Sequence, residues 1–219
     1  MKLDWSVVWQ YRAEFAEGLG LTILLTLLTM VFATLIGFAV MMIRNSSMRT
    51  VRLGGDAFVE FFRNLPLILV IYWAFYVLPI IVHVHASPFV TGLIALTLGV
   101  SAYTAETFRA GVNSIRAGQS DAAAALGMSR WQAMRIVIFP QAARRVLPAL
   151  ANIWVSLFKD TSLVSVISVA ELTFTSMQLR AQTFRVLEMV TAMTVIYWCL
   201  GYPQAKLVDW INRKFEVVE

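Results

Sequence analysis

The chain has 219 residues, of which 59% are hydrophobic and 14% are charged, and its mean hydropathy is +0.71. Soluble domains are about 45–50% apolar and about 25% charged, so this composition excludes an ordinary soluble domain and indicates an all-α integral membrane protein. The length suits one domain of roughly five spans at about 20 apolar residues each. In a membrane protein, basic residues report which loops face the cytoplasm. We therefore attribute the net charge of +5 to topology and expect no nucleic-acid partner. The one cysteine, Cys199, excludes a disulfide within the chain.

Residues 1–20 are mixed in charge and carry Trp5, Trp9 and Tyr11. Aromatic residues of this kind are typical of an amphipathic segment at a membrane surface. Acidic residues precede the apolar run and no A-x-A site follows it, so the pattern is not that of a cleaved signal peptide.

Five apolar stretches are long enough to cross a bilayer, and we expect spans at 22–43, 57–82, 88–107, 141–158 and 186–210. The first span carries small or hydroxylated residues at three- to five-residue spacing, namely Thr22, Thr26, Thr29, Ala33 and Gly37. Small residues allow close approach of helices in lipid, so this face is predicted to pack against another span.

Charged residues interrupt the second and third spans. Glu60 and Arg63 share one helix face and are candidates for an ion pair, and Glu106 is a candidate partner of Arg109. His83 and His85 lie in the link between these spans. Two histidines suggest a metal site, but no third ligand is nearby, so a polar hairpin at the surface is favoured.

The fourth span contains Pro148, which predicts a kink or a broken helix. Lys159 and Asp160 follow it. Residues 161–170 are apolar but too few to span, and are predicted to form a re-entrant or surface-packed helix.

Basic residues divide the loops into two sets. One set comprises Arg44, Arg49, Arg52, Arg109, Arg116, Arg130, Arg135, Arg144, Arg145, Lys206, Arg213 and Lys214. The other comprises Lys2, Arg12, Arg180 and Arg185 and is offset by acidic residues. The positive-inside rule places the first set in the cytoplasm, with the N-terminus outside, the C-terminus inside and residues 108–140 in a cytoplasmic loop.

The stretch from Ser120 to Pro140 is a polar insert between the third and fourth spans. Ser120 is a suitable N-cap, with Asp121 at the first helical position, and Gly127 is suited to the left-handed conformation that ends a helix. A short helix over 120–126 is therefore expected. Its narrow alanine face suits a groove on a partner protein, and the alternative is an amphipathic helix on the lipid headgroups.

Three features of this insert resemble the EAA loop of ABC importer permeases, which reads E-A-A-x-x-x-G, nine residues, I-x-L-P. They are Asp121-Ala122-Ala123, Gly127, and Val137 with Phe139-Pro140. Asp replaces Glu, Val replaces Ile and Phe replaces Leu, and each substitution keeps the physical character. Residues 58–69, 102–119 and 157–172 also resemble the polar amino-acid uptake subfamily, so the resemblance covers nearly the whole chain after about residue 20.

The resemblance implies that residues 1–219 form a single permease domain of type I importer fold in a bacterial inner membrane. It implies a second permease subunit, identical or homologous, an ATPase homodimer that holds ATP and Mg, and an extracytoplasmic solute-binding protein. The chain has no G-x-x-x-x-G-K-[ST] motif, and we expect no bound cofactor, no metal site and no catalytic residue. The residues assigned by resemblance to ATPase coupling are Asp121, Ala122, Ala123 and Gly127, flanked by Arg116 and Arg130.

Charges at membrane depth are costly and usually functional, which makes Lys159 and Asp160 candidates for the solute path. A zwitterionic solute needs both a cation and an anion, and in the resembling family this position lies near the pore centre. Thr161 and Ser162 adjoin this pair, and residues 161–170 are expected in an outer gate. Glu60 and Arg63 are further path candidates, with structural pairing as the alternative. Acidic, basic and amide amino acids, opines and ectoine-like solutes all remain candidates.

Three other classes of membrane protein fit the sequence less well. An inverted internal repeat is typical of a secondary transporter, and no such repeat is visible in the sequence, which disfavours an ion channel or secondary transporter. A membrane-embedded enzyme needs a nucleophile and base or a metal constellation, and neither G-x-S-x-G nor H-E-x-x-H is present. The polar residues at membrane depth disfavour a non-transporting scaffold.

Overall fold

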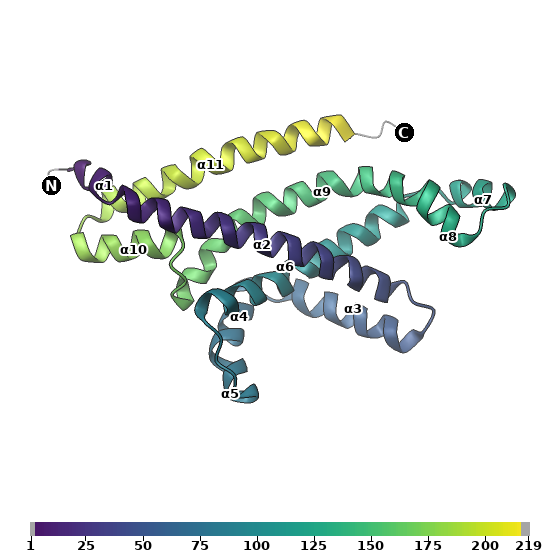
Figure 1. The fold of residues 1–219 in the computed structure, drawn as a ribbon, viewed down its shortest axis with the longest axis horizontal. Coiled ribbons are helices and arrows are strands. Elements are labelled where there is room, and N and C mark those ends of the chain that lie inside the picture. Colours follow the sequence, from purple (N-terminus) through teal and green to yellow (C-terminus); the bar gives the residue numbers. More distant parts are fainter. Residues whose placement is uncertain (1–2, 216–219) are drawn as a thin grey trace.

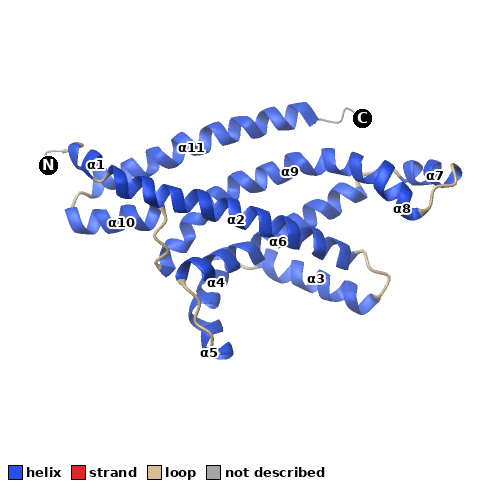
Figure 2. Cartoon of the chain, viewed as in Figure 1, coloured by secondary structure: helices blue, strands red, loops and turns tan. Residues whose placement is uncertain are grey.

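The computed structural model describes residues 3–215, and all regular structure in that range is helical (Figures 1 and 2). The helices are α1 (Ser6–Gln10), α2 (Arg12–Arg44), α3 (Arg49–Asn64), α4 (Leu67–Tyr72), η1 (Trp73–Val77), α5 (Leu78–Val82), α6 (Pro88–Asn113), α7 (Ala117–Ala125), α8 (Arg130–Gln132), η2 (Ala133–Ile138), α9 (Phe139–Asp160), η3 (Thr161–Ile167), α10 (Leu172–Thr183) and α11 (Val186–Phe215). The predicted all-α class is confirmed.

Helix α2 packs along α6, and the predicted face of small residues makes this contact. Its predicted small residues are all buried, and the Thr104 hydroxyl of α6 donates a hydrogen bond to the Ala33 carbonyl at 2.8 Å. A Cβ atom on Gly37 would overlap the Thr104 hydroxyl, so only glycine allows the two backbones to approach this closely.

Of the four long helices, α2, α6 and α11 run in one direction and α9 runs in the other. Early residues of α2 meet early residues of α6 (Leu25 with Leu96), and late ones meet late ones (Arg44 with Glu106), so these two helices run in the same direction. Helix α9 runs the opposite way, because Val100 of α6 packs with Leu157. Helix α11 is antiparallel to α9 and therefore returns toward the end of the molecule that carries α7, the α7 end (Figure 1).

The predicted second span, 57–82, is wrong as a single continuous helix. Helix α3 begins earlier, at Arg49, and ends at Asn64; α4 then leaves it at an angle of 106°. Leu65 is extended because Pro66 disfavours helical geometry in the residue before it. Four helices of the described chain are long and apolar enough to cross a membrane, and five crossings result if the bent pair counts as one. Since α2 and α6 run in the same direction, the bent pair must return the chain between them.

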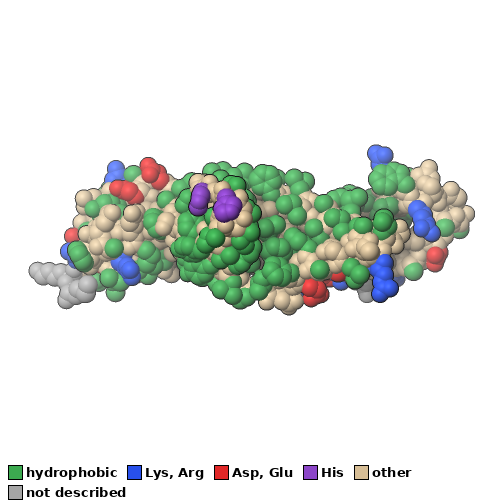
Figure 3. Space-filling view, turned by 90° about the horizontal axis from the view of Figure 1, so that it is seen from below, with side chains coloured by type: hydrophobic (Ala, Val, Ile, Leu, Met, Phe, Trp, Pro, Cys, Tyr) green, Lys and Arg blue, Asp and Glu red, His purple; other side chains and the backbone are tan. Residues whose placement is uncertain are grey.

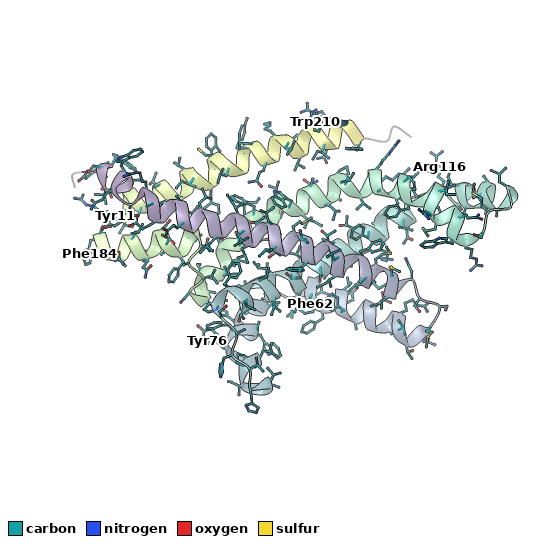
Figure 4. The ribbon with its side chains drawn as sticks, viewed as in Figure 1. Tyr11, Phe62, Tyr76, Arg116, Phe184 and Trp210 are labelled. Atoms are coloured by element: carbon teal, nitrogen blue, oxygen red, sulfur yellow. The ribbon has the colours of Figure 1, made fainter. Side chains whose placement is uncertain are left out.

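Helices α4 and α5, joined by the π-helix η1, form an arm that projects from the bundle (Figure 1). Val70, Ile71 and Ala74 are buried against the bundle, whereas Trp73, Tyr76 and Ile80 are exposed; Figure 4 labels Tyr76 on the arm. The two histidines lie together at its tip, surrounded by hydrophobic side chains (Figure 3). His83 takes the left-handed conformation that ends α5.

The fourth apolar region differs in part from its expected form. Of the kink and the break expected at Pro148, the break is wrong, because α9 continues through this residue. Of the re-entrant and the surface-packed helix expected over 161–170, the surface-packed form is wrong, because η3 buries Val164 and Ile167 in the main core against Leu25 and Leu96, and the re-entrant form stays a prediction. The 3₁₀ geometry ends at Ser168, which has a positive φ of 63°.

The N-terminal region differs from the segment predicted over 1–20. Only Ser6–Gln10 forms a separate short helix, and α2 already begins at Arg12, so half of the segment is the first turns of a span. Trp9 is exposed, and the Asp4 amide donates to Glu188 of α11 at 3.1 Å. Lys2, counted in the charge distribution, lies outside the described residues.

Candidate functional site

Helix α7 occupies the predicted insert but begins one turn earlier than expected. Its N-cap is Arg116, so Ser120 and Asp121 lie inside the helix and the predicted capping role of Ser120 is wrong. Helix α6 ends before Ser114, and Arg116 is not helical. The Gln119 amide donates to the Arg116 carbonyl at 2.9 Å, and this hydrogen bond forms the first turn of α7. Asp121 is thus exposed one turn into the helix.

The C-terminal end of α7 has the predicted glycine cap. Gly127 has φ of +74° and is exposed, and its amide donates to Ala124 at 3.0 Å. The Met128 amide donates to Ala123 at 3.1 Å, which completes a Schellman motif. Ser129 and Gln132 then form a capping box that starts α8. The turn between α7 and α8 is therefore fixed by local hydrogen bonds at both of its ends.

One face of α7 packs on the chain and the other is open. Ala123 is buried, whereas Asp121, Ala122, Gly127, Arg130 and Arg116 are exposed; Figure 4 labels Arg116 beside the start of the helix. Leu126 and Trp131 are 78% and 71% exposed. The Gln141 side chain donates to Gln119 at 3.2 Å and ties α7 to the start of α9. The result is a short, braced helix with apolar side chains at its tip.

A cavity of about 370 Å³ lies between α6 and α9. It adjoins the break that separates α3 from α4. Its polar lining consists of Tyr103, Asn152, Ser156 and Asp160. The apolar walls include Phe62, which lies near that break (Figure 4). Asp160 is the charged residue of this lining. The cavity can therefore accept a solute of mixed polarity with a cationic group.

The other residues predicted near Asp160 point elsewhere. Lys159 is exposed and does not line the cavity. The Thr161 hydroxyl is buried and donates to the Phe158 carbonyl at 2.7 Å, and the Ser162 hydroxyl donates to the Lys159 carbonyl at 2.8 Å. Within this subunit the structure thus brings Asp160, and not Lys159, Thr161 or Ser162, to the cavity.

Glu60 and Arg63 do not pair with each other. Glu60 instead accepts a hydrogen bond from the Asn64 side chain at 3.1 Å. The Arg63 guanidinium lies 5.8 Å from the centre of the Tyr103 ring and its Nη1 is 3.7 Å from Glu106 Oε2. Arg63 therefore reaches α6, while Glu60 remains exposed on α3.

Glu106 is the centre of an ionic network between α2, α3 and α6. Arg44, with 7% of its side chain exposed, donates to Glu106 at 2.6 Å and to Asp56 at 2.7 Å. The predicted pair of Glu106 and Arg109 is confirmed. Arg44 was placed among the loop arginines, but it is a buried structural cation.

Sequence reasoning missed three cavity residues: Tyr103, Asn152 and Ser156. Asn152, Ser156 and Asp160 recur every four residues in a span, and this spacing places them on one helix face. That polar stripe was the available signal. Tyr103 had no comparable signal, since its position follows from packing of α3 on α6.

Residues 33–217 match the family described as "Binding-protein-dependent transport system inner membrane component". The chain is 32% identical over 220 residues to the glutamate/aspartate import permease protein GltK of Escherichia coli O6:H1 (strain CFT073), with 97% of this chain and 98% of the relative covered. It is also 32% identical over 219 residues to the glutamine transport system permease protein GlnP of Escherichia coli (strain K12), with both chains fully covered.

Among solved structures, the chain is similar to a crystal structure of an amino acid ABC transporter with histidines. The TM-score is 0.91 at 32% sequence identity, and the match covers 98% of this chain and all of the other.

Proposed function

Because this chain belongs to the family of inner-membrane components of binding-protein-dependent transport systems, as a permease subunit of an ABC importer, we propose that it moves a polar amino acid or an amino-acid-like solute into the cytoplasm. The observation that carries this proposal is similarity over the full length to permeases named for glutamate, aspartate and glutamine. The relatives indicate the class of solute, and a separate binding protein selects the individual solute.

The coupling role is assigned to α7. Its open face carries Asp121, Ala122 and Gly127, and the exposed Leu126 and Trp131 supply an apolar tip. Such side chains on a helix braced at both ends suit a hydrophobic groove on a partner. We assign that groove to the ATPase, with Ala123 as the buried support of the helix and Arg116 and Arg130 as flanking contacts.

The solute path is assigned to the cavity between α6 and α9. Asp160 provides an anion for the ammonium group of an amino acid, and Asn152 and Ser156 provide neutral hydrogen-bonding groups. Lys159 and Ser162 remain in the proposed path as neighbours of Asp160, at positions that a second subunit would complete. Thr161 supports this position from inside the subunit, because its buried hydroxyl donates to the Phe158 carbonyl. Arg63 is assigned to the path because it contacts Tyr103 and Glu106 of α6. Glu60 is assigned to it because it lies on the same end of α3.

The proposed assembly has three kinds of protein component and lies in the lipid bilayer of a bacterial inner membrane. Two permease subunits, copies or paralogues, form the pore. An ATPase homodimer binds ATP and Mg and hydrolyses ATP, and an extracytoplasmic protein delivers the solute. The α7 end, which collects the loop arginines, is placed in the cytoplasm.

The coupling assignment is tested by purification of the whole complex from cells that co-express all its subunits. Ala122→Asp introduces a charge on the open face of α7, and loss of an interface residue of this kind costs about 2 kcal/mol, or roughly thirtyfold in affinity. We expect the ATPase recovered with the permease and the uptake of labelled glutamine, glutamate and arginine to fall together.

Gln182→Asp is the matched control, since it places the same charge on exposed α10 at the opposite end of the molecule. Retention of the ATPase and of uptake by Ala122→Asp would reject the coupling role of α7. Absence of uptake for every amino acid and related solute by the intact complex would reject the proposed solute class.

A further inference from the structure

A second cavity follows the first along the groove between α6 and α9. It measures about 360 Å³ and is lined by Glu106, Ala110 and Ser114 of α6 and by Arg145 and Ala149 of α9. Tyr103 of the first cavity and Glu106 of the second lie about one turn apart on α6, as do Asn152 and Ala149 on α9. The two cavities are therefore consecutive, and the second lies nearer the α7 end.

Arg63 contacts one wall residue of each cavity, Tyr103 of the first and Glu106 of the second. Its guanidinium lies 5.8 Å from the centre of the Tyr103 ring and 3.7 Å from Glu106, and its carbonyl accepts a hydrogen bond from the Tyr103 hydroxyl at 3.4 Å. These three residues meet at the junction of the cavities. They come from the end of α3 and the middle of α6.

The contacts of Arg63 are weaker than the rest of the ionic network. Arg44 binds Glu106 at 2.6 Å with 7% of its side chain exposed, whereas Arg63 is 41% exposed and lies 3.7 Å away. Tyr103 is 47% exposed. A long, partly solvated contact breaks at little cost, while a short buried one holds its carboxylate in place. Glu106 is thus a fixed anchor and Arg63 is the group that can move.

Arg63 also lies next to the break in the second span. Only Asn64 separates it from the extended Leu65, where α3 and α4 diverge by 106°. Leu65 and Leu67, on either side of Pro66, line the first cavity. A change of angle at this break therefore moves a wall of the first cavity and the guanidinium of Arg63 together.

We propose that Arg63, Tyr103 and Glu106 form a gate between the two cavities, in which Arg63 closes the solute path on the side of the α7 end by bridging Tyr103 and Glu106. Arg63 and Tyr103 act as gating residues and Glu106 as their anchor. This proposal rests on the assignment of the solute path to the groove between α6 and α9.

The test measures thiol accessibility in the full complex in membrane vesicles. Cys199, the one native cysteine, is replaced by serine, and a single thiol is introduced by Ser156→Cys in the first cavity or by Ala149→Cys in the second. A membrane-impermeant methanethiosulfonate reagent is applied to right-side-out and to inside-out vesicles in turn. Reaction rates are then compared with the reagent on the membrane face from which it reaches the Ala149→Cys thiol.

From that face the Ser156→Cys thiol should react slowly while the gate is intact. Adding Arg63→Ala or Tyr103→Ala should raise its reaction rate by about tenfold, since each removes contacts that favour the closed state. The rate at Ala149→Cys should not change. Tyr103→Phe keeps the ring and Arg63→Lys keeps the cation, so both controls should leave the Ser156→Cys thiol protected.

An equal rate at Ser156→Cys in the presence and absence of both alanine substitutions would overturn the gate. The side of the membrane from which the reagent reaches Ala149→Cys reports separately on topology. Loss of uptake after the thiol has reacted reports on the solute path. A failure of the gate is thereby distinguished from a failure of the proposed function.

Discussion

Arg44 illustrates how one residue can be read in two ways. In sequence it ends the first span beside Arg49 and Arg52, and it therefore resembles a loop cation. In the structure its guanidinium bridges Asp56 of α3 and Glu106 of α6. A buried cation of this kind fixes helices relative to one another, because removal of one partner leaves the other charge unpaired.

Replacing Arg44 should destabilise the protein far more than replacing a neighbouring arginine. Arg44→Met leaves Glu106 without its shortest contact from α2, and breaking a buried pair costs about 3–5 kcal/mol. Because Arg109 and Arg63 still contact Glu106, we expect the lower end, about 3 kcal/mol. The measurement is thermal unfolding of the purified complex in detergent. Arg49→Met, an exposed residue, is the control, and equal melting temperatures would contradict this account.

At the scale of elements, α10 depends on one buried acid at its start. Glu171 accepts hydrogen bonds from the amides of Thr173 and Phe174 and from the hydroxyl of Tyr197 on α11. It is fully buried, and burial raises the pKa of its carboxyl group above the usual 4.5. Its N-cap role thus joins the start of α10 to α11.

The raised pKa of Glu171 predicts a pH dependence of stability. The folded state holds the proton more tightly than the unfolded state, so the contribution of this group is fully present below pH 4.5 and is lost as pH rises through the folded pKa. Glu171→Gln cannot titrate. The melting temperature of the wild type minus that of Glu171→Gln should therefore fall as pH rises above 4.5. Glu17→Gln, at an exposed position on α2, controls for loss of a carboxylate, and a constant difference for Glu171→Gln would refute the effect.

Elements also differ in how well the sequence specified them. Four spans were placed from apolar length alone, and Gly127 ended α7 as predicted, because both signals are local. The start of α7 was misplaced because the preference of serine for the N-cap is too weak by itself to fix where a helix begins, and residues 117–119 already form the first turn of the helix. The break in the second span lies at Pro66 and was not predicted, and its angle of 106° follows from packing of α4 on α6 and η3.

At the scale of the whole molecule, the directions of the long helices constrain topology. Helices α2, α6 and α11 run toward the α7 end and α9 runs away from it, so the described N-terminal residues and the end of α11 lie at opposite ends (Figure 1). The loop arginines gather at the α7 end. The proposed orientation therefore places α1 and α10 outside and the end of α11 inside.

This orientation is tested with three markers on the full chain. In a Cys199→Ser background, Phe184→Cys places a thiol in the highly exposed link between α10 and α11. An impermeant maleimide should label it in intact spheroplasts, whereas a reporter fused to the C-terminus should be active in the cytoplasm. The Ala122→Cys thiol on α7 should react only after the cells are opened. Labelling of Ala122→Cys in intact spheroplasts would invert the topology.

The sequence by itself determined the membrane class, the approximate spans and the insert with its glycine cap, because each depends on composition or on hydrogen bonds between near neighbours. It also indicated Lys159 and Asp160 together through the cost of charges at membrane depth. Only the tertiary structure decided that Asp160 shares a cavity with Tyr103, that Arg63 contacts Glu106 and not Glu60, and that Arg44 is buried. Those pairings join residues on different helices, and the depth and rotation of each helix are set by close packing such as that of Gly37 on Thr104, which no single segment encodes.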